Sequence, residues 1–462
     1  MANVKEYDAI VIGSGVAGTP LAKKLANAGW KTVLIEKRWV GGTCTNDGCT
    51  PTKTMIASAR EAFQAGRCSE LGVTINGFSV SIDAVIDRKD EIVQLFRNHA
   101  EEAVLETKNL SLIYGNATFL DDKTIEVLTN EGPKKTLTAK HIFIVTGTSP
   151  QIPDTPGLNN SGYYTTTTLM DLREIPEHLI IMGGGYIALE FSQMYQRFGS
   201  KVTILERDEV FLQREDDDLA EEIRDILTTD GIDIVTGCIV NEVNGSPGKV
   251  TLQVTAGGKK KTIKGSHLLV AAGRTPNTEE LNLAAAGVKV DEKGYIITNN
   301  KLQTNKRHIY ALGEVNGGPK FTHIAFDDYR IVTENLLNGG KASIAKRLVS
   351  YCIFMDPQVG RVGITEKEAK EQGLDYKIAK LPMRLVARAI ETSNTKGFYK
   401  AIVDAKTHKI LGAAILGQQG GEIVTVVQVA MMGGLTYHHL RNSPIAHPTY
   451  AESLNNLFAK VV

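Results

Sequence analysis

The chain has 462 residues, which is too long for one hydrophobic core and predicts about three domains. Lys plus Arg and Asp plus Glu both number 52, so neither sign of charge is in excess to attract nucleic acid, an anionic membrane or an acidic partner. The five cysteines are too sparse for a disulfide scaffold, and we expect a multidomain globular protein whose partners are small.

The N-terminal residues MANVKEYDAIVIG lack the basic start, long apolar stretch and small-residue cleavage site of a secretory signal. No apolar run in the sequence approaches the roughly 20 residues that cross a bilayer. We therefore expect a cytoplasmic protein that binds neither membranes nor nucleic acid.

The first recognisable unit is a strand, a glycine-rich turn and a helix. YDAIVIG (7–13) is a buried parallel strand by its apolar run, LAKKLANAG fits an amphipathic helix, and KTVLIE fits a second strand. The turn between strand and helix matches the dinucleotide-binding pattern at Gly13, Gly15 and Gly18. The helix N-terminus would offer N–H groups to a pyrophosphate, and Glu36 would accept hydrogen bonds from a ribose.

Two cysteines, Cys44 and Cys49, follow within GGTCTNDGCTPTK (41–53). They could form an inert structural disulfide, half of a metal site, or a pair that opens and closes in turnover. A metal site would need a further Cys or His pair nearby, and a structural disulfide is poorly supported in a cytoplasmic chain, so the redox pair is favoured. Pro51 is tolerated in a first helical turn, which would place Cys49 at a helix N-terminus and favour its thiolate.

The same strand, turn and helix recur downstream in HLIIMGGGYIALEF, where the three pattern positions are Gly183, Gly185 and Ala188. SKVTILE then ends in Glu206, and the 23 positions that separate it from Gly183 equal the spacing in the first unit. Two dinucleotide sites imply two nucleotides, most simply a flavin dinucleotide and a nicotinamide dinucleotide.

Three other stretches carry structural expectations. The acidic run REDDDLAEEIRDIL, from Arg214, fits the start of an amphipathic helix, and we expect its charges to form a solvated face. KGFYKAIVDAKTHKILGAAILG fits an antiparallel sheet and EIVTVVQVAMM a helix packed on it. Cys68, Cys238 and Cys352 lack paired spacing and are expected to be ordinary buried or half-buried residues.

Taken together, these features resemble the class I pyridine nucleotide-disulfide oxidoreductases, which include dihydrolipoamide dehydrogenase, glutathione reductase and mercuric reductase. The resemblance rests on GGTCTNDGCTPTK and both glycine patterns and covers essentially the whole chain. Six further segments occur in the family's order: YGNATF (114–119), IVTGTSP (144–150), VAAGRTPN (270–277), IYALGEV (309–315), FMDPQVGRVGITE (354–366) and AHPTYAE (446–452).

The resemblance implies an α/β fold with two Rossmann-like dinucleotide-binding domains, one for FAD and one for NAD(P), and a C-terminal α+β dimerisation domain. The FAD-binding domain would comprise residues 1–150 and 274–346, interrupted by the NAD(P)-binding domain at 151–273. Residues 347–462 would form the dimerisation domain. The family also implies a homodimer whose active sites are shared between subunits.

In this family a reduced nicotinamide passes hydride to the flavin, and the flavin reduces the disulfide. By resemblance, Cys49 makes the charge-transfer contact with the flavin, and Cys44 is the interchange thiol that meets the substrate. Lys53 resembles the lysine near flavin N5, and Glu190 is its matching carboxylate partner. Tyr186 resembles the tyrosine that covers the flavin until nicotinamide displaces it.

His447 and Glu452 resemble the family's acid–base pair, in which the histidine takes the proton of the interchange thiol and the carboxylate fixes the tautomer. Glu314 stands where the family has Asp; it could still bind the flavin ribityl hydroxyl, with one extra methylene to accommodate. Further positions that the resemblance assigns to cofactor binding are Gly42, Thr43, Ala117, Gly147 and Gly273.

The second site carries conflicting signals on the choice between NADH and NADPH. Glu206 would bind a ribose 2′-hydroxyl and repel a 2′-phosphate, whereas the adjacent Arg207 could receive that phosphate. In the family, Ala at the position of Ala188 often accompanies NADPH. We expect a modest preference for NADH.

The C-terminus bears on the electron acceptor. Mercuric reductases of the well-known type carry a terminal cysteine pair and lack a histidine at the HPT position, whereas this chain ends in SLNNLFAKVV and has His447. Dihydrolipoamide dehydrogenases commonly carry a second histidine where Ile445 stands. The chain looks most similar to mercuric reductase-like flavoproteins without terminal cysteines, a group that includes a reactive-chlorine-resistance enzyme associated with copper reduction.

The first hypothesis is an NAD(P)H-dependent flavoprotein reductase that acts on a disulfide or a metal ion in oxidant or metal defence and holds no metal of its own. Dihydrolipoamide dehydrogenase, working within a dehydrogenase complex, is the alternative. A non-catalytic flavin redox sensor is an alternative from another class. The intact set of Cys44, Cys49, Lys53 and His447 argues against the sensor.

Overall fold

The computed structural model describes residues 4–461, and contacts divide this chain into two units. The first unit contains the segment ending at Thr54, Asp87–Gln151 and Gly273–Arg347. The second unit contains Met55–Ile86, Ile152–Ala272 and the chain from Leu348 onward. The predicted three-domain boundaries, which also include residues 1–3 and 462 outside the described part, stay a prediction.

The first unit is built on a sheet with a parallel centre. Strand β1 is apolar and buried from Ala9 to Ile12 and pairs in parallel with β2 on one side and β5 on the other, while β4 joins β3 to β5 as an antiparallel ribbon. Burial on both faces explains the continuous apolar run of β1. The strands are β1 (Lys5–Ile12), β2 (Thr32–Glu36), β3 (Leu110–Phe119), β4 (Thr124–Thr129), β5 (Lys135–Ile144) and β15 (Ile309–Ala311).

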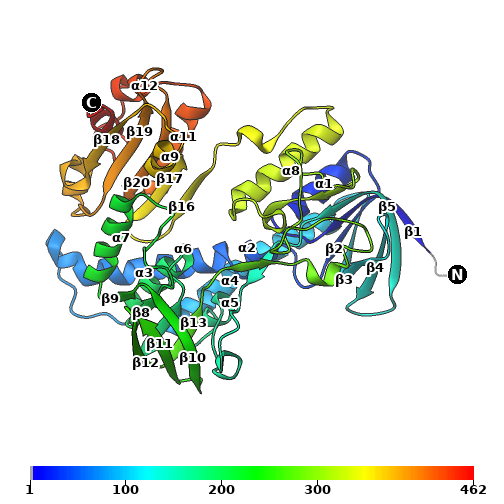
Figure 1. Ribbon diagram of the computed structural model, residues 1–462, viewed down its shortest axis with the longest axis horizontal. Coiled ribbons are helices and arrows are strands. Elements are labelled where there is room, and N and C mark those ends of the chain that lie inside the picture. The colour runs from blue at the N-terminus through cyan, green and yellow to red at the C-terminus, as the bar shows by residue number, and fades with distance from the viewer. Residues whose placement is uncertain (1–3, 462) are drawn as a thin grey trace. The chain divides into compact units, whose positions relative to one another are not determined.

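Helices α1 and α8 pack side by side on this sheet, and their apolar faces share one core cluster with its strands (Figure 1). A two-stranded ribbon of β6 (Thr148–Pro150) and β14 (Arg274–Pro276) leads the chain out of the unit and back into it. The helical elements are α1 (Gly18–Asn27), α2 (Gly42–Asn46), η3 (Glu279–Leu281), η4 (Gly313–Asn316), α8 (Thr322–Leu337) and η5 (Ile344–Lys346). Two long helices, α3 (Cys49–Arg67) and α4 (Ile82–Leu105), each have residues in both units.

The second unit contains a repeat of the strand, turn and helix. Its four-stranded parallel sheet has the order β13-β7-β8-β9, and helix α6 follows β7 as α1 follows β1. These elements are η2 (Leu158–Asn160), α5 (Thr166–Leu169), β7 (His178–Met182), α6 (Tyr186–Phe198), β8 (Lys201–Leu205), α7 (Asp217–Thr229), β9 (Ile232–Val235) and β13 (His267–Val270). An antiparallel sheet of β10 (Cys238–Ser246), β11 (Lys249–Ala256) and β12 (Lys259–Gly265) precedes β13.

The C-terminal part of the second unit is α+β. Its five-stranded antiparallel sheet has the order β16-β17-β20-β19-β18, and α11 packs on it, as the sequence predicts. Its strands are β16 (Ser350–Ile353), β17 (Gln358–Gly363), β18 (Tyr376–Pro382), β19 (Phe398–Asp404) and β20 (Ile410–Gly417). The remaining helices of the unit are η1 (Cys68–Leu71), α9 (Glu366–Glu371), η6 (Met383–Leu385), α10 (Ala387–Glu391), α11 (Gly420–Met432), α12 (Tyr437–Asn442) and α13 (Ser453–Phe458).

The expectation that the acidic run from Arg214 forms a solvated face is wrong at its start. Glu215 is 0 % exposed and Asp216 is 2 % exposed. The reason is that buried cations from the C-terminal sheet lie beside them: Arg361 is within 3.6 Å of Glu215, and Lys400 is within 3.2 Å of Asp216. Paired charges can be buried where single ones cannot.

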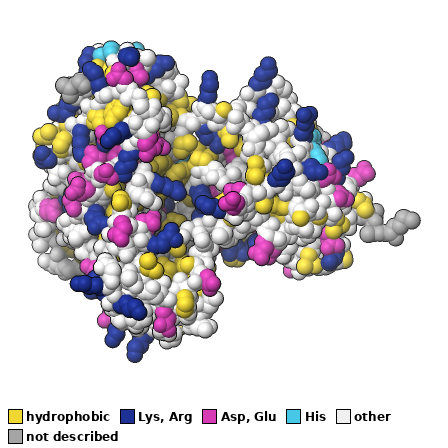
Figure 2. Space-filling view, viewed as in Figure 1, with side chains coloured by type: hydrophobic (Ala, Val, Ile, Leu, Met, Phe, Trp, Pro, Cys, Tyr) yellow, Lys and Arg dark blue, Asp and Glu magenta, His cyan; other side chains and the backbone are white. Residues whose placement is uncertain are grey.

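No helix within residues 4–461 combines the length and the apolar character that a membrane crossing requires. Over the face shown in Figure 2, basic and acidic side chains are interspersed, and neither sign gathers into one continuous patch. This distribution agrees with the equal numbers of acidic and basic residues in the sequence.

Candidate active site

Each glycine of the first pattern has its own steric reason. Gly13 has φ of +101°, and a Cβ there would lie 2.4 Å from the carbonyl oxygen of Val145; a Cβ on Gly18 would lie 2.0 Å from the carbonyl oxygen of Gly13. Gly15 differs, because nothing lies within 4 Å of where its Cβ would be. Backbone carbonyl groups therefore leave no room for a side chain at Gly13 and Gly18, whereas space is open at Gly15. That open space fits a bound pyrophosphate.

Glu36 ends β2, and its carboxylate is fixed by the turn itself. It accepts hydrogen bonds from the backbone N–H of Ser14 (3.0 Å), from the Ser14 hydroxyl (2.6 Å) and from the N–H of Arg38 (2.9 Å). Ser14 is fully buried. The carboxylate thus has a defined position next to the open side of the turn, where a ribose would bind.

The second pattern repeats this construction. A Cβ on Gly183 would lie 2.4 Å from the carbonyl oxygen of Ala271, and space is open at Gly185. Ala188 is fully buried in α6. Glu206 accepts the N–H of Gly184 (2.6 Å) and the N–H of Asp208 (2.9 Å), as Glu36 does in the first unit. The two sites therefore share one design, and each fits a dinucleotide.

The loop that carries the cysteines packs directly on the first turn. Gly41 and Gly42 have positive φ, and a Cβ on Gly42 would lie 2.6 Å from Cα of Gly15. Asn46, which is buried in α2, donates to the carbonyl oxygens of Val40 and Gly42 and accepts a 2.7 Å hydrogen bond from Arg97 on α4. Thr43 is exposed on the same loop. The cysteine loop therefore lies directly against the first glycine turn.

Cys44 and Cys49 both contact one hydroxyl group, that of Thr322. Thr322 Oγ1 lies 3.1 Å from Cys49 Sγ and donates to Cys44 Sγ at 3.4 Å. A hydrogen bond with Cys49 and burial raise the pKa of Cys44, and the hydrogen bond from Thr322 lowers it. Helix α3 begins at Cys49, as the sequence predicts.

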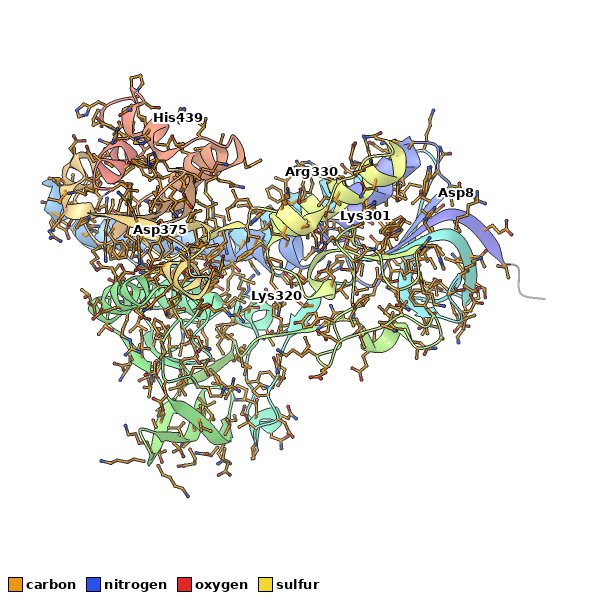
Figure 3. All side chains as sticks on the ribbon, turned by 45° about the horizontal axis from the view of Figure 1, so that its top comes forward. Asp8, Lys301, Lys320, Arg330, Asp375 and His439 are labelled. Atoms are coloured by element: carbon orange, nitrogen blue, oxygen red, sulfur yellow. The ribbon has the colours of Figure 1, made fainter. Side chains whose placement is uncertain are left out.

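Thr322 is a site residue that the sequence did not reveal. It is the first residue of the 16-residue helix α8, whose course Figure 3 marks with Lys320 just before its start and Arg330 within it. The partially positive N-terminus of this helix therefore faces the two sulfurs and favours a thiolate. Thr322 is 273 residues from Cys49 and belongs to no cysteine motif. The one signal in the sequence that could have identified it is its position at the start of a helix.

The predicted lysine and glutamate occupy different units. Lys53 lies in the first turns of α3, half-buried and four residues after Cys49. Glu190 is 8 % exposed on α6 and accepts the N–H of Phe354 at 2.9 Å. Their partnership stays a prediction.

His447 and Glu452 are brought together. His447 Nδ1 lies 3.0 and 2.9 Å from the two carboxylate oxygens of Glu452, and the histidine side chain is 68 % exposed. This geometry places the ring proton on Nδ1 and leaves Nε2 able to accept a proton. The pair is therefore arranged as a base with its orienting carboxylate.

Glu314 lies in η4 and is tied within its own unit. It accepts a hydrogen bond from the hydroxyl of Thr148 and forms a 3.3 Å ion pair with Arg274 Nε. Binding of a ribityl hydroxyl by this carboxylate stays a prediction. Among the other expected positions, Gly147 has φ of +65° with open space at its Cβ position, and Gly273 has φ of +126°.

The remaining expectations concern Ala117, Tyr186 and metal binding. Ala117 is 6 % exposed in β3, and Tyr186 is the first residue of α6, where its hydroxyl donates to Glu215. Within residues 4–461, no cluster of three or more His, Cys, Asp or Glu side chains could hold a metal ion.

Models of two protein families match the chain. Residues 7–328 match the pyridine nucleotide-disulphide oxidoreductase family, and residues 349–458 match the dimerisation domain of that family. The first match runs from β1 to α8, and the second match covers the C-terminal α+β part of the second unit.

Several characterised proteins are similar over their full length or most of it. A probable pyridine nucleotide-disulfide oxidoreductase, RclA of Escherichia coli K12, is 39 % identical over 99 % of this chain and 100 % of its own length. A mercuric reductase of Staphylococcus aureus is 36 % identical over 97 % of this chain and 81 % of its own. A dihydrolipoyl dehydrogenase of Geobacillus stearothermophilus is 30 % identical over 97 % and 94 %.

Solved structures agree with these sequence relationships. The Cu(II) complex of the HOCl-induced flavoprotein disulfide reductase RclA from Escherichia coli superimposes with a TM-score of 0.91 and 38 % identity, covering 99 % of each chain. A second structure of the same protein gives a TM-score of 0.90 over 99 % of this chain and 100 % of that one.

The two open glycines should separate the two nucleotide sites. In Gly15→Ala, the new methyl enters the space for the pyrophosphate, and we expect FAD affinity to fall about tenfold or more, since charge-assisted hydrogen bonds of about 1.5–3 kcal/mol are lost. Gly185→Ala should weaken NAD⁺ binding by a similar factor and leave FAD content unchanged. FAD absorbance after gel filtration and NAD⁺ calorimetry measure the two effects, and loss of both nucleotides from both variants would contradict this assignment.

The Thr322 hydroxyl should lower the pKa of Cys44. In a Cys49→Ala background, Thr322→Val should raise that pKa by about one to two units, the value of a hydrogen bond to a charged group. Iodoacetamide alkylation of the reduced protein at a series of pH values measures the shift. Thr322→Ser, which keeps the hydroxyl, is the control and should behave as the parent; equal curves for all three proteins would exclude this role.

Proposed function

The chain belongs to the pyridine nucleotide-disulphide oxidoreductase family, and we propose that it passes electrons from NAD(P)H through Cys44 and Cys49 to a disulfide or a metal ion. Members of this family use FAD and NAD(P)H. The observation that carries the proposal is the pair of thiols joined by Thr322 on a loop packed against the first nucleotide turn. FAD, when bound at that turn, supplies the hydride chemistry that links the nicotinamide to the cysteines.

The residues of the chain have complementary tasks in this reaction. Oxidation of the two thiols to a disulfide releases two electrons and two protons, which suffice to reduce one substrate disulfide or two Cu(II) ions. Thr322 and the α8 N-terminus stabilise negative charge on a sulfur. His447, oriented by Glu452, takes the proton of the thiol of the partner's Cys44.

The two thiols support a metal ion as the electron acceptor. Thiolates bind soft and borderline metal ions, and two of them close together form a bidentate ligand. Relatives of this chain include mercuric reductases, and one solved relative is a Cu(II) complex. A role in oxidant or metal defence follows from such an acceptor. The dihydrolipoyl dehydrogenases among the relatives keep lipoamide as the second candidate.

We also propose a homodimer with shared active sites. The family model for a dimerisation domain covers residues 349–458, and α11 in this segment exposes apolar side chains, with Val429 at 62 % and Met432 at 71 %. Covering these side chains with a second copy would remove them from water. His447, exposed on the same segment, would then be available to the partner's thiols.

The direct test is anaerobic titration with NADH, followed by addition of lipoamide, glutathione disulfide, Cu(II) or Hg(II). We expect a long-wavelength absorption band that depends on Cys49, and the acceptor that most rapidly reoxidises the protein identifies the substrate class. Cys44→Ser should still be reduced by NADH but should lose at least about 99 % of acceptor turnover, because a lost nucleophile is not replaced. Cys68→Ser, which changes a half-buried cysteine on η1, is the matched control. Full turnover by Cys44→Ser would overturn the proposal.

Glu206 should favour NADH over NADPH. Its carboxylate is held at the end of β8 by two backbone N–H groups, so it cannot turn away from a 2′-phosphate, whereas Arg207 is 82 % exposed. A like-charge contact of about 1–2 kcal/mol corresponds to a preference of about five- to thirtyfold in kcat/KM. Glu206→Gln should reduce this ratio. A larger effect of Arg207→Ala on NADPH would instead identify Arg207 as the phosphate ligand.

A further inference from the structure

A buried carboxylate binds two tyrosines in the second unit. The hydroxyl of Tyr186 and the hydroxyl of Tyr351 both donate to Glu215 Oε1, the second at 2.5 Å. The two phenol oxygens are 3.1 Å apart, and the rings stack with centroids separated by 5.5 Å. Glu215 is 0 % exposed. We call these three residues the tyrosine–glutamate cluster.

The protons of the cluster can be assigned by counting. Three oxygen atoms contact one another, but the two phenols supply only two protons, and an ionised carboxylate supplies none. Burial and the adjacent carboxylate raise the pKa of both Tyr186 and Tyr351, so both phenols keep their protons. Each phenol therefore donates to Glu215, and the two compete for the same oxygen.

The other side of Glu215 faces a buried cation. Arg361, on β17, places Nε 3.6 Å from Glu215 Oε2 and is 1 % exposed. That distance is too long for a hydrogen bond, and Oε2 has no hydrogen-bond partner within the described residues. Arg361 thus faces one oxygen of the carboxylate, while the two phenols make the close contacts with the other oxygen.

Tyr186 also lies next to the second glycine turn. It directly follows Gly185, whose missing side chain leaves the space that fits the pyrophosphate, and it is the first residue of α6. A phenol ring at this place has to take an orientation that either permits or hinders the nicotinamide nucleotide. The hydrogen bond to Glu215 fixes that orientation in the structure.

We propose that Glu215 is a positioning residue that holds the Tyr186 ring in its nucleotide-free orientation, and that Tyr351 keeps Glu215 hydrogen-bonded when nucleotide binding moves Tyr186 away. This inference rests on the proposed use of NAD(P)H at the second site. Leaving a buried carboxylate without a donor is costly, and Tyr351 removes that cost. The second tyrosine therefore makes the movement of the first one easier.

The two phenols should have opposite effects on nucleotide binding. Tyr351→Phe removes the competing donor, so Glu215 holds Tyr186 more tightly, and we expect NAD⁺ binding to weaken by about three- to tenfold, the net value of an ordinary hydrogen bond. Tyr186→Phe removes the restraint itself and should strengthen binding. Both substitutions keep the stacked rings, so they test the hydroxyls alone.

The decisive measurement is a double-mutant cycle on the flavin-loaded protein. NAD⁺ affinity is measured by calorimetry, and the NADH dependence of flavin reduction is measured by rapid mixing. If Tyr351 acts through Tyr186, Tyr351→Phe has no effect in the Tyr186→Phe background, and its effect in the parent appears in the half-saturating NADH concentration rather than in the limiting rate. Tyr195→Phe on the same helix is the matched control, because that hydroxyl donates to the carbonyl oxygen of Leu169.

Each remaining outcome has a separate meaning. An equal effect of Tyr351→Phe in both backgrounds, or no effect in either, would overturn the proposal, since it would show a structural role or none. Failure of the parent protein to bind NAD⁺ and to be reduced by NADH or NADPH would overturn the proposed function itself. Thermal unfolding of each variant distinguishes a loss of folding from a loss of binding.

Discussion

The close approach of Gly42 to Gly15 is the contact on which the candidate active site depends. A side chain on Gly42 would meet the Cα atom of Gly15 at 2.6 Å, so the backbone of the cysteine loop lies directly on the nucleotide turn. Backbone atoms alone make this contact, so no side chain separates the cysteine loop from the turn. The thiols therefore owe their position beside the first nucleotide site to backbone packing, and the short helix α2, fixed by Asn46, carries that position to Cys44.

The two nucleotide sites show how one local design is used for two purposes. In both, a glutamate at the end of the second strand is held by backbone N–H groups of the glycine turn and of the residue two positions later. The surroundings then differ: the first turn receives the cysteine loop, and the second receives the tyrosine–glutamate cluster. The repeated unit thus provides the same glycine turn and fixed carboxylate twice, whereas the segments packed against the turn differ.

Buried charges are concentrated at the start of the acidic run from Arg214, which was expected to be solvated. Glu215 and Asp216 lie near Arg361 at distances of 3.6 and 3.8 Å, which are too long for strong hydrogen bonds. Such an arrangement is a poor source of stability, because desolvation of the charges offsets their attraction. Local rules are most often broken at functional sites, and the hydrogen bond of Glu215 with Tyr186 joins this ionic cluster to the residue that follows the second glycine turn.

The sequence by itself determined the features that depend on neighbouring residues. The glycine turn, the helix and the acidic strand end lie within 24 residues in each unit, so the period of apolar residues and the glycine spacing sufficed to predict both turns and the start of α3 at Cys49. Only the tertiary structure decided that Thr322 lies between the two thiols, that Glu314 pairs with Arg274, and that the acidic run from Arg214 is buried at Glu215. These contacts join distant segments of the chain. No local periodicity encodes them, because they depend on how the sheets bring helix ends and strands together.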